Sequence, residues 1–229
     1  MDVAALVSVV GQVGRAGSGA PNAWTPVRGE PLLTHAVRSL LASECVAHVF
    51  VSASASDVDR TARAVSGLPA TVLEAGEHRN DALRLGLRTA QAELPRLSVI
   101  LLHDPTRAFA PPALTRSVVD AVRAGAPAAV PVLPVADTIK QVNAEGVVLG
   151  TQDRGELRAP QTPQGFAVDV LCAACAADTP PLDHVAAPVT VPGHPYAVKI
   201  ATPFDLTAAE AVFAGDEHTV GVHHARGSR

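Results

Sequence analysis

Short apolar runs alternate with amphipathic segments along most of the chain, from residue 3 to about residue 132. Runs of Val, Leu and Ala predict buried strands, whereas apolar residues three and four positions apart predict helices that bury one face. The segment 31–42, for example, places Leu33, Val37 and Leu40 at helical spacing. The pattern predicts strands at residues 3–10, 46–52, 70–74, 98–102 and 128–132, and helices at 31–42, 56–65, 79–94 and 112–124.

The alternation of strands and helices favours right-handed crossovers and a mostly parallel sheet. Strands that are apolar throughout are expected where helices cover both faces of the sheet. We therefore predict an α/β fold with a Rossmann-like, mostly parallel sheet between two layers of helices. Because ligands bind beyond the carboxyl ends of such strands, the candidate functional segments are those that follow a strand, at residues 11–22, 52–54, 76–79 and 103–107.

The pattern changes at about residues 135–165, where apolar residues become sparse. Two strand-like pieces, at 138–142 and 147–150, flank a turn and predict a projecting β-hairpin arm. Such an arm has little apolar mass of its own and needs another surface to pack on. A second copy of the chain is the simplest such surface, so we expect a homodimer that forms through the arm.

The C-terminal part predicts two further strands, at 189–191 and 197–200, and a last helix at 205–213. The polar residues 215–229 are expected to form a disordered tail. We therefore expect a single domain over residues 1–214, from which the arm projects.

Composition narrows the class of protein. Of 229 residues, 48% are hydrophobic and only 3% aromatic, so a large core must consist of Ala, Val and Leu. The net charge of -4 does not indicate a general nucleic-acid surface. No apolar run approaches the ~20 residues of a membrane span, and no basic stretch precedes the first apolar run. We expect a cytoplasmic protein that binds neither nucleic acid nor membrane.

The three cysteines include a C-x-x-C pair, Cys172 and Cys175. This spacing is found in redox and zinc sites, but also by chance on helices. The apolar flanks and the absence of a second cysteine pair favour two cysteines on a buried helix.

The sharpest signal of chemistry is "LLHDPTRAF", in which Asp104 directly follows a buried strand and Arg107 comes three residues later. A carboxylate at this place could hold a divalent ion that bridges nucleotide phosphates. The alternative is that Asp104 caps its own loop and that Arg107 forms a local ion pair.

Two other cations stand at unusual places. Arg79 is expected at the start of a helix, where a positive charge opposes the helix dipole unless an anion joins it; a solvated arginine is the alternative. Lys199 lies within the apolar piece predicted as the strand 197–200, where a lysine must reach an anion or extend to solvent.

A glycine-rich segment, "GQVGRAGSGAPN", follows the first strand. Glycines allow backbone amides to approach a phosphate closely. Arg15 lies among these glycines, but the segment contains no lysine, which such loops usually carry.

In this order, the glycine loop, "HDPTR", "DTIK", "DR", "QTPQGF" and "KI…DL" resemble the 2-C-methyl-D-erythritol 4-phosphate cytidylyltransferase family over residues 3 to about 213. The resemblance implies a nucleotide-binding α/β sheet and a homodimer in which the β-arm embraces the other subunit. It implies CTP as co-substrate, Mg²⁺ as cofactor and an isoprenoid-precursor product. In that reaction the phosphate of methylerythritol phosphate attacks the α-phosphorus of CTP, and pyrophosphate leaves.

On the nucleotide side, the resemblance implies that Arg15 binds the triphosphate and acts in catalysis. Gly11 corresponds to the glycine at the base of the loop, and Arg79 to the arginine near the cytosine. Asn22 occupies the position of a family lysine that contacts the α-phosphate.

On the other side, the resemblance implies that Asp104 serves both the metal ion and catalysis, and that Lys199 is catalytic as well. Thr138 and Arg154 would reach from the arm into the partner's site. The residues that would hold the sugar-alcohol phosphate are Arg107, Thr138, Arg154, Thr162 and Lys199.

Most departures from the family pattern fall on the nucleotide side, where Asn22 replaces the lysine and Ala82 a serine. Loss of one transition-state contact typically costs ~3–4 kcal/mol, or on the order of a hundred- to thousandfold in rate. Three hypotheses follow: an active but slowed cytidylyltransferase, a catalytically silent paralogue that binds a ligand or a partner, and a sugar nucleotidyltransferase for another base. The third does not explain the arm motifs.

Overall fold

The computed structural model describes residues 2–11 and 20–219, with side chains as far as residue 212. Within these residues, eight strands form one sheet in the order β10-β7-β11-β6-β1-β4-β5, and β12 pairs with β7. The strands are β1 (Asp2–Ser8), β4 (His48–Ala53), β5 (Ala70–Glu74), β6 (Leu97–His103), β7 (Ala128–Pro134), β10 (Arg158–Pro160), β11 (Gln164–Ala167) and β12 (Val189–Pro192).

The centre of the sheet is parallel, as the alternation of strands and helices predicts. Leu6 of β1 lies opposite Phe50 of β4 and Leu102 of β6, with all three strands running in the same direction. Strand β11 runs antiparallel to both β6 and β7. Consequently, the start of β11 lies at the same edge of the sheet as the ends of β1 and β6, and this edge carries the site described below.

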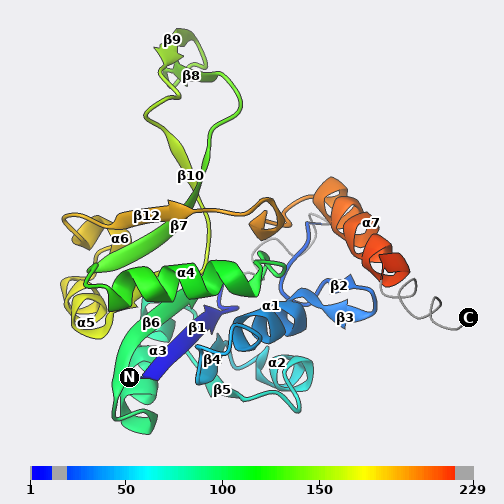
Figure 1. Cartoon of the computed structure of the whole chain (residues 1–229), viewed down its shortest axis with the longest axis vertical. Coiled ribbons are helices and arrows are strands. Elements are labelled where there is room, and N and C mark those ends of the chain that lie inside the picture. Colours follow the sequence, from blue (N-terminus) through cyan, green and yellow to red (C-terminus); the bar gives the residue numbers. More distant parts are fainter. Residues whose placement is uncertain (1, 12–19, 220–229) are drawn as a thin grey trace, which may run out of the picture.

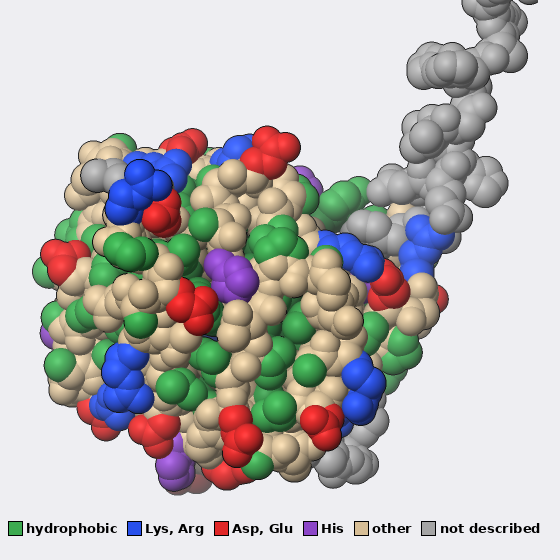
Figure 2. Space-filling view, turned by 90° about the horizontal axis from the view of Figure 1, so that it is seen from below, with side chains coloured by type: hydrophobic (Ala, Val, Ile, Leu, Met, Phe, Trp, Pro, Cys, Tyr) green, Lys and Arg blue, Asp and Glu red, His purple; other side chains and the backbone are tan. Residues whose placement is uncertain are grey.

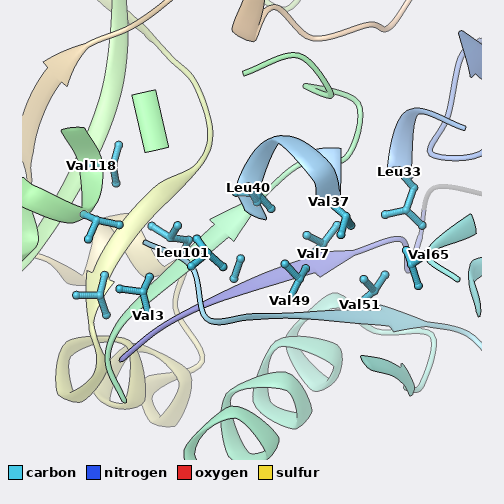
Figure 3. Close-up of a cluster of buried hydrophobic side chains, with 14 of the residues drawn as sticks. Val3, Val7, Leu33, Val37, Leu40, Val49, Val51, Val65, Leu101 and Val118 are labelled. Atoms are coloured by element: carbon cyan, nitrogen blue, oxygen red, sulfur yellow. The ribbon is translucent and has the colours of Figure 1, made fainter. Parts of the chain in front are cut away.

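Helices cover both faces of the sheet (Figure 1). On one face, Leu33, Val37 and Leu40 pack with Val7 and Val49 of the sheet in a core of aliphatic side chains (Figure 3). On the other face, Leu87 and Leu171 pack against Phe50 and Ile100. The predicted α/β fold class, with a mostly parallel sheet between helices, is confirmed. The helices of the first face are α1 (Leu32–Leu41), α2 (Val58–Ala64) and α4 (Pro112–Arg123), and those of the second are α3 (Arg79–Glu93) and α5 (Val168–Ala177).

The arm projects from the body as the hairpin of β8 (Ile139–Val142) and β9 (Val148–Gln152), which form a separate antiparallel sheet (Figure 1). Its apolar side chains are exposed, for example Leu149 at 62%. The expected range of 135–165 is too long, because β10 and the start of β11 return to the main sheet. The sequence does not reveal this, since the partner strands of β10 and β11 lie far away along the chain.

Three short pieces escape the sequence pattern. The strands β2 (Pro26–Val27) and β3 (Glu30–Pro31) form a small hairpin, and α6 (Pro181–His184) is a single turn. Each is too short to show a periodic pattern of apolar residues.

Two predictions for the C-terminal part are wrong. The expected strand 197–200 is instead a 3₁₀ turn, η2 (Pro195–Ala197), followed by extended chain. Its buried residues Ala197 and Ile200 are three positions apart, so the run "AVKI" only resembles a strand. The last helix, α7 (Pro203–Thr219), continues through residues 215–219, which the sequence assigns to a disordered tail. Elongation of a formed helix adds one hydrogen bond per residue and needs no new nucleus.

Charged side chains of both signs are scattered over the face shown in Figure 2, without a patch of one sign. Within the described ranges, no helix is both long enough and apolar enough to cross a membrane.

Candidate functional site

A cleft of about 880 Å³ lies at the edge of the sheet where β1, β4 and β6 end. The start of α3, the β10–β11 loop and residues 199–201 contribute to its lining, as do residues 20–22, 104–107 and 178–181. The cleft brings together most of the candidate residues, namely Gly11, Asn22, Arg79, Asp104, Arg107, Thr162 and Lys199.

These residues fall into two groups by their contacts. We call Asp104, Arg107, Thr162 and Lys199 the Asp104 group, and Gly11, Asn22, Arg79 and Ala82 the Asn22 group.

Asp104 is held in a fixed orientation by its own loop. Its Oδ1 accepts hydrogen bonds from the backbone N–H of Thr106 at 2.9 Å and from the Thr106 hydroxyl at 2.7 Å. Its backbone N–H donates to Oγ1 of Thr162 at 3.1 Å. The sequence-based alternative of a loop-capping Asp104 is therefore correct for one carboxylate oxygen, while the other faces Lys199.

Lys199 meets Asp104 across the mouth of the cleft. The Nζ atom of Lys199 lies 3.1 Å from Oδ2 of Asp104, and the two side chains are 53% and 21% exposed. Burial raises the pKa of Asp104, but the hydrogen bonds from Thr106 and the charge of Lys199 outweigh it and hold that pKa below its usual value. Asp104 is thus ionised at neutral pH, and the ion pair is intact there.

His103, the last residue of β6, is buried beneath this ion pair. Its Nδ1 lies 3.1 Å from Oγ1 of Thr162. Burial lowers the pKa of His103 to about 4, so the ring is neutral at pH 7. Nε2 is buried and has no hydrogen-bond partner in the described part of the chain.

Arg107 connects two backbone segments. Its Nη1 donates to the carbonyl of Ala197 at 2.7 Å, and its Nη2 to the carbonyl of Pro160 at 3.2 Å. Burial lowers its pKa, although the carboxylate of Asp104 opposes this. Among the described residues, Arg107 forms no salt bridge, and the carboxylate of Asp104 pairs with Lys199.

In the Asn22 group, the side chain of Asn22 forms a turn. Its Oδ1 accepts from the backbone N–H of Trp24 at 3.0 Å, and the backbone N–H of Asn22 donates to Oγ1 of Thr25 at 2.8 Å. Side-chain amides of Asn commonly stabilise turns in this way. Gly11 has a φ of +76°, a conformation that favours glycine.

Arg79 is the first residue of α3 and is exposed toward the cleft, as the sequence predicts. No salt bridge connects it to another residue among those described. Ala82, one turn further along α3, is buried, and its carbonyl accepts from the Ser52 hydroxyl at 3.2 Å.

Two candidate residues, Thr138 and Arg154, do not line the cleft of their own chain. Thr138 and Arg154 are exposed on the arm, where Arg154 donates to the carbonyl of Ala136. Arg15 lies outside the described residues, and so do Gly14 and Gly17.

Two residues at the site were missed by sequence reasoning. Thr106 orients Asp104, and an Asp followed two residues later by Thr is a recognisable turn signal. Gln161 is 3% exposed and binds the backbone of His194. Only the three-dimensional fold reveals the contact between Gln161 and His194, because the two residues are far apart in the sequence.

The acidic side chains of the cleft decide whether a metal ion could bind there. No cluster of three or more His, Cys, Asp or Glu side chains suited to a metal occurs within residues 2–11 and 20–212. Two carboxylates of the described residues line the cleft, and both are in ion pairs, Asp178 with Arg84 and Asp104 with Lys199. Asp104 is the candidate ligand because it directly follows β6 at the edge of the sheet where the cleft lies. One carboxylate together with substrate phosphates and water is a ligand set that Mg²⁺ commonly uses, so the residues fit a metal ion that arrives with a nucleotide.

The sequence pattern of the 2-C-methyl-D-erythritol 4-phosphate cytidylyltransferase family matches residues 3–215. A protein of that name from Saccharopolyspora erythraea is 49% identical over 224 residues, which cover 93% of this chain and 100% of that protein. One from Nocardia farcinica is 45% identical and covers 92% of this chain and 93% of its own length.

Solved structures agree. The crystal structure of 2-C-methyl-D-erythritol 4-phosphate cytidylyltransferase from Thermus thermophilus is 30% identical, with a TM-score of 0.73, and covers 93% of this chain and 98% of that one. The 4-diphosphocytidyl-2C-methyl-D-erythritol synthase from Anaerococcus prevotii, at 19% identity and a TM-score of 0.77, covers 93% and 98% of the two chains and shares the fold.

Proposed function

The chain belongs to the 2-C-methyl-D-erythritol 4-phosphate cytidylyltransferase family, and we propose that the cleft around Asp104 is where it carries out the family's reaction. The enzyme joins CTP and 2-C-methyl-D-erythritol 4-phosphate and releases pyrophosphate, a step of isoprenoid-precursor synthesis. A phosphate oxygen of the sugar alcohol attacks the α-phosphorus of CTP, and the bond from this phosphorus to the pyrophosphate oxygen breaks. The hypothesis of a catalytically silent paralogue is not favoured, because relatives at 45–49% identity carry the enzyme's name.

The ion pair between Lys199 and Asp104 is the observation that supports this location of the site. It places a cation and an ionised carboxylate 3.1 Å apart at the mouth of the cleft. The hydroxyl of Thr162 lies beside them, held by the N–H of Asp104. Transfer of a nucleotidyl group depends mainly on positioning and on neutralising phosphate charge, and needs no covalent protein intermediate.

The residues of the Asp104 group take the following roles. Lys199 would bind the phosphate of the sugar alcohol and keep it close to the α-phosphorus. Thr162 and Arg107 would fix the rest of this substrate. Asp104 would hold Mg²⁺, which when bound neutralises charge on the phosphate oxygens. Asp104 also orients Lys199 through the ion pair.

The Asn22 group would receive CTP. The N–H of Gly11 lies at the base of the glycine-rich loop, Arg79 would approach the cytidine, and Arg15 would bind the triphosphate. Asn22 brings no charge, and its amide oxygen is engaged by Trp24. We therefore propose that the enzyme binds both substrates but turns over more slowly than it would with a lysine at position 22.

A homodimer would complete the site. The arm exposes a row of aliphatic side chains, Val142, Val147, Val148 and Leu149, at 52–62%. Exposed apolar groups gathered on one element are typical of an interface. A partner's arm would then bring Thr138 and Arg154 to the Asp104 group. We also propose a cytoplasmic location, since the three cysteines are free thiols and such thiols persist in reducing compartments.

A direct assay tests the proposed function. Purified protein is incubated with CTP, Mg²⁺ and methylerythritol phosphate, and pyrophosphate release is followed, with each component omitted in turn. Release that requires all three supports the proposal. Absence of release at saturating substrate, or release without the sugar-alcohol phosphate, would contradict it.

A further inference from the structure

Two segments far apart in the sequence lie side by side at the Asp104 group. We call residues 160–163 the Thr162 loop and residues 193–200 the Lys199 segment, after the functional residue that each carries. Backbone bonds anchor the Lys199 segment at both ends: the N–H of Gly193 donates to the Val132 carbonyl at 2.8 Å, and that of Ile200 to the Thr106 carbonyl at 2.9 Å.

The side chain of Gln161 connects the two segments. Its Nε2 donates to the carbonyl of His194 at 2.9 Å, and its Oε1 accepts from the N–H of His194 at 2.8 Å. The pairing of β12 with β7 ends at Pro192. Beyond Gly193, the carboxamide of Gln161 pairs with the N–H and the carbonyl of His194, in the way that a neighbouring strand would.

The fit at this contact is close. A Cβ at position 193 would lie 2.4 Å from Oε1 of Gln161 and 2.8 Å from the carbonyl oxygen of Val132. Only glycine allows this approach without a shift of the backbone. Gln161 is 3% exposed, so water cannot easily replace it as the partner of His194.

Arg107 forms a second connection between the same segments. Its guanidinium bridges the carbonyl of Pro160, in the Thr162 loop, and that of Ala197, in the Lys199 segment. Gln161 and Arg107 thus hold together the two stretches of chain that carry Thr162 and Lys199.

We propose that Gln161 is a positioning residue: by pairing with His194, it fixes the Lys199 segment against the Thr162 loop and keeps Lys199 at Asp104. This role rests on the proposed function of Lys199. Gln161 lines the cleft, but both polar atoms of its carboxamide are engaged by the backbone of His194. Small displacements of a charge-neutralising group are costly in reactions that depend on positioning.

The kinetic test is a double-mutant cycle of Gln161→Met and Lys199→Met. Methionine keeps the approximate length of glutamine but removes both hydrogen bonds. Gln161→Met is expected to lower kcat/KM for methylerythritol phosphate on the order of ten- to hundredfold, with little change in KM for CTP. In the Lys199→Met background, the same change is expected to cost less than about threefold, because Gln161 acts through Lys199.

Amide exchange of the substrate-free protein provides an independent measurement. Gln161→Met and Gly193→Ala are each expected to speed hydrogen exchange in residues 194–200, while exchange in β1 and β6 stays unchanged. Gln91→Met, on the exposed end of α3, is the matched control and leaves exchange and activity unchanged.

Equal and additive losses in both backgrounds, or unchanged exchange in residues 194–200, would overturn the proposal. Failure of the proposed function can be told apart from failure of this proposal. In the first case the wild-type protein is inactive, but hydrogen exchange still reports whether Gln161 holds the Lys199 segment.

Discussion

The Asp104 group and the Asn22 group line the same cleft but are held in different ways. In the Asp104 group, charged and polar side chains bind one another or the backbone: Asp104 pairs with Lys199 and Thr106, and Arg107 with two carbonyls. In the Asn22 group, the amide oxygen of Asn22 accepts from a backbone N–H within its own turn, so it is directed at the chain and not at a ligand.

This difference indicates which half of the site is preorganised. The Asp104 group has its charges in place before any substrate binds, which favours transition-state stabilisation without reorganisation. In the proposed function, the charge for the triphosphate would come from Arg79, from Arg15 outside the described residues, or from the metal ion. Substitutions in the two groups should therefore have opposite effects on activity. Those in the Asp104 group should lower it, whereas a cation introduced at position 22 should raise it.

The largest effect is expected from Asp104→Asn. The amide can still accept from Thr106, but it loses the charge that pairs with Lys199 and binds a metal ion. We expect kcat/KM to fall on the order of a hundred- to thousandfold, measured by pyrophosphate release. A loss of less than about tenfold would remove Asp104 from the reaction.

The opposite change is expected for Asn22→Lys, which restores a cation at the α-phosphate. The hydrogen bond from the Trp24 N–H to the Asn22 side chain is lost, at a cost of about 1 kcal/mol in the free energy of unfolding. We nevertheless expect kcat to rise by about a hundredfold. Asn22→Ala, which loses the turn without gaining charge, is the control. If kcat of Asn22→Lys does not exceed that of wild type, the missing cation at position 22 does not limit turnover.

Mixing two impaired variants tests whether the arm serves the partner's site. Arg154→Ala and Lys199→Met are each expected to lower kcat/KM, the former about tenfold or more. After subunit exchange, half of the dimers are mixed and each has one intact site, so about a quarter of wild-type activity should return. If the arm served its own chain, no activity would return on mixing.

A smaller effect is expected on the free energy of unfolding, and it depends on His103, which is buried next to the Asp104 group. The pKa of His103 is about 4 in the folded chain, against an ordinary value of 6.5 for an exposed ring. The unfolded chain therefore binds an extra proton between these pH values, and the free energy of unfolding decreases as pH falls below 6.5.

We expect His103 to account for about 2 kcal/mol of the loss between pH 7 and pH 5. Denaturant unfolding at the two pH values checks this, with His103→Asn as the comparison. The variant should lose about 2 kcal/mol less than wild type over this interval. An equal loss in both proteins would show that His103 titrates normally.

The sequence predicts the cleft better than the contacts within it. Asp104, Arg79 and Gly11 follow strands, and the topology of a parallel sheet alone brings such residues to one edge. The strand 70–74 coincides with β5, because the run is bounded on both sides by turn residues.

The remaining contacts depend on pairs that no local pattern encodes. Gln161 meets His194, and Arg107 meets Ala197, only because β12 returns beside β7. The apolar neighbours of Lys199 favour a strand there. In the structure, Ala197 and Ile200 are both buried while Lys199 between them remains exposed, so its place at Asp104 is set by the anchors on either side.

In the proposed function, the ion pair of Lys199 and Asp104 marks the place of the reaction. The most direct measurement is pyrophosphate release from CTP by wild type, Lys199→Met and Lys199→Arg, at saturating CTP and over a range of methylerythritol phosphate. We expect Lys199→Met to lose on the order of a hundredfold or more in kcat/KM for methylerythritol phosphate, and Lys199→Arg to recover part of this loss. Equal kcat/KM for wild type and Lys199→Met would contradict this proposal.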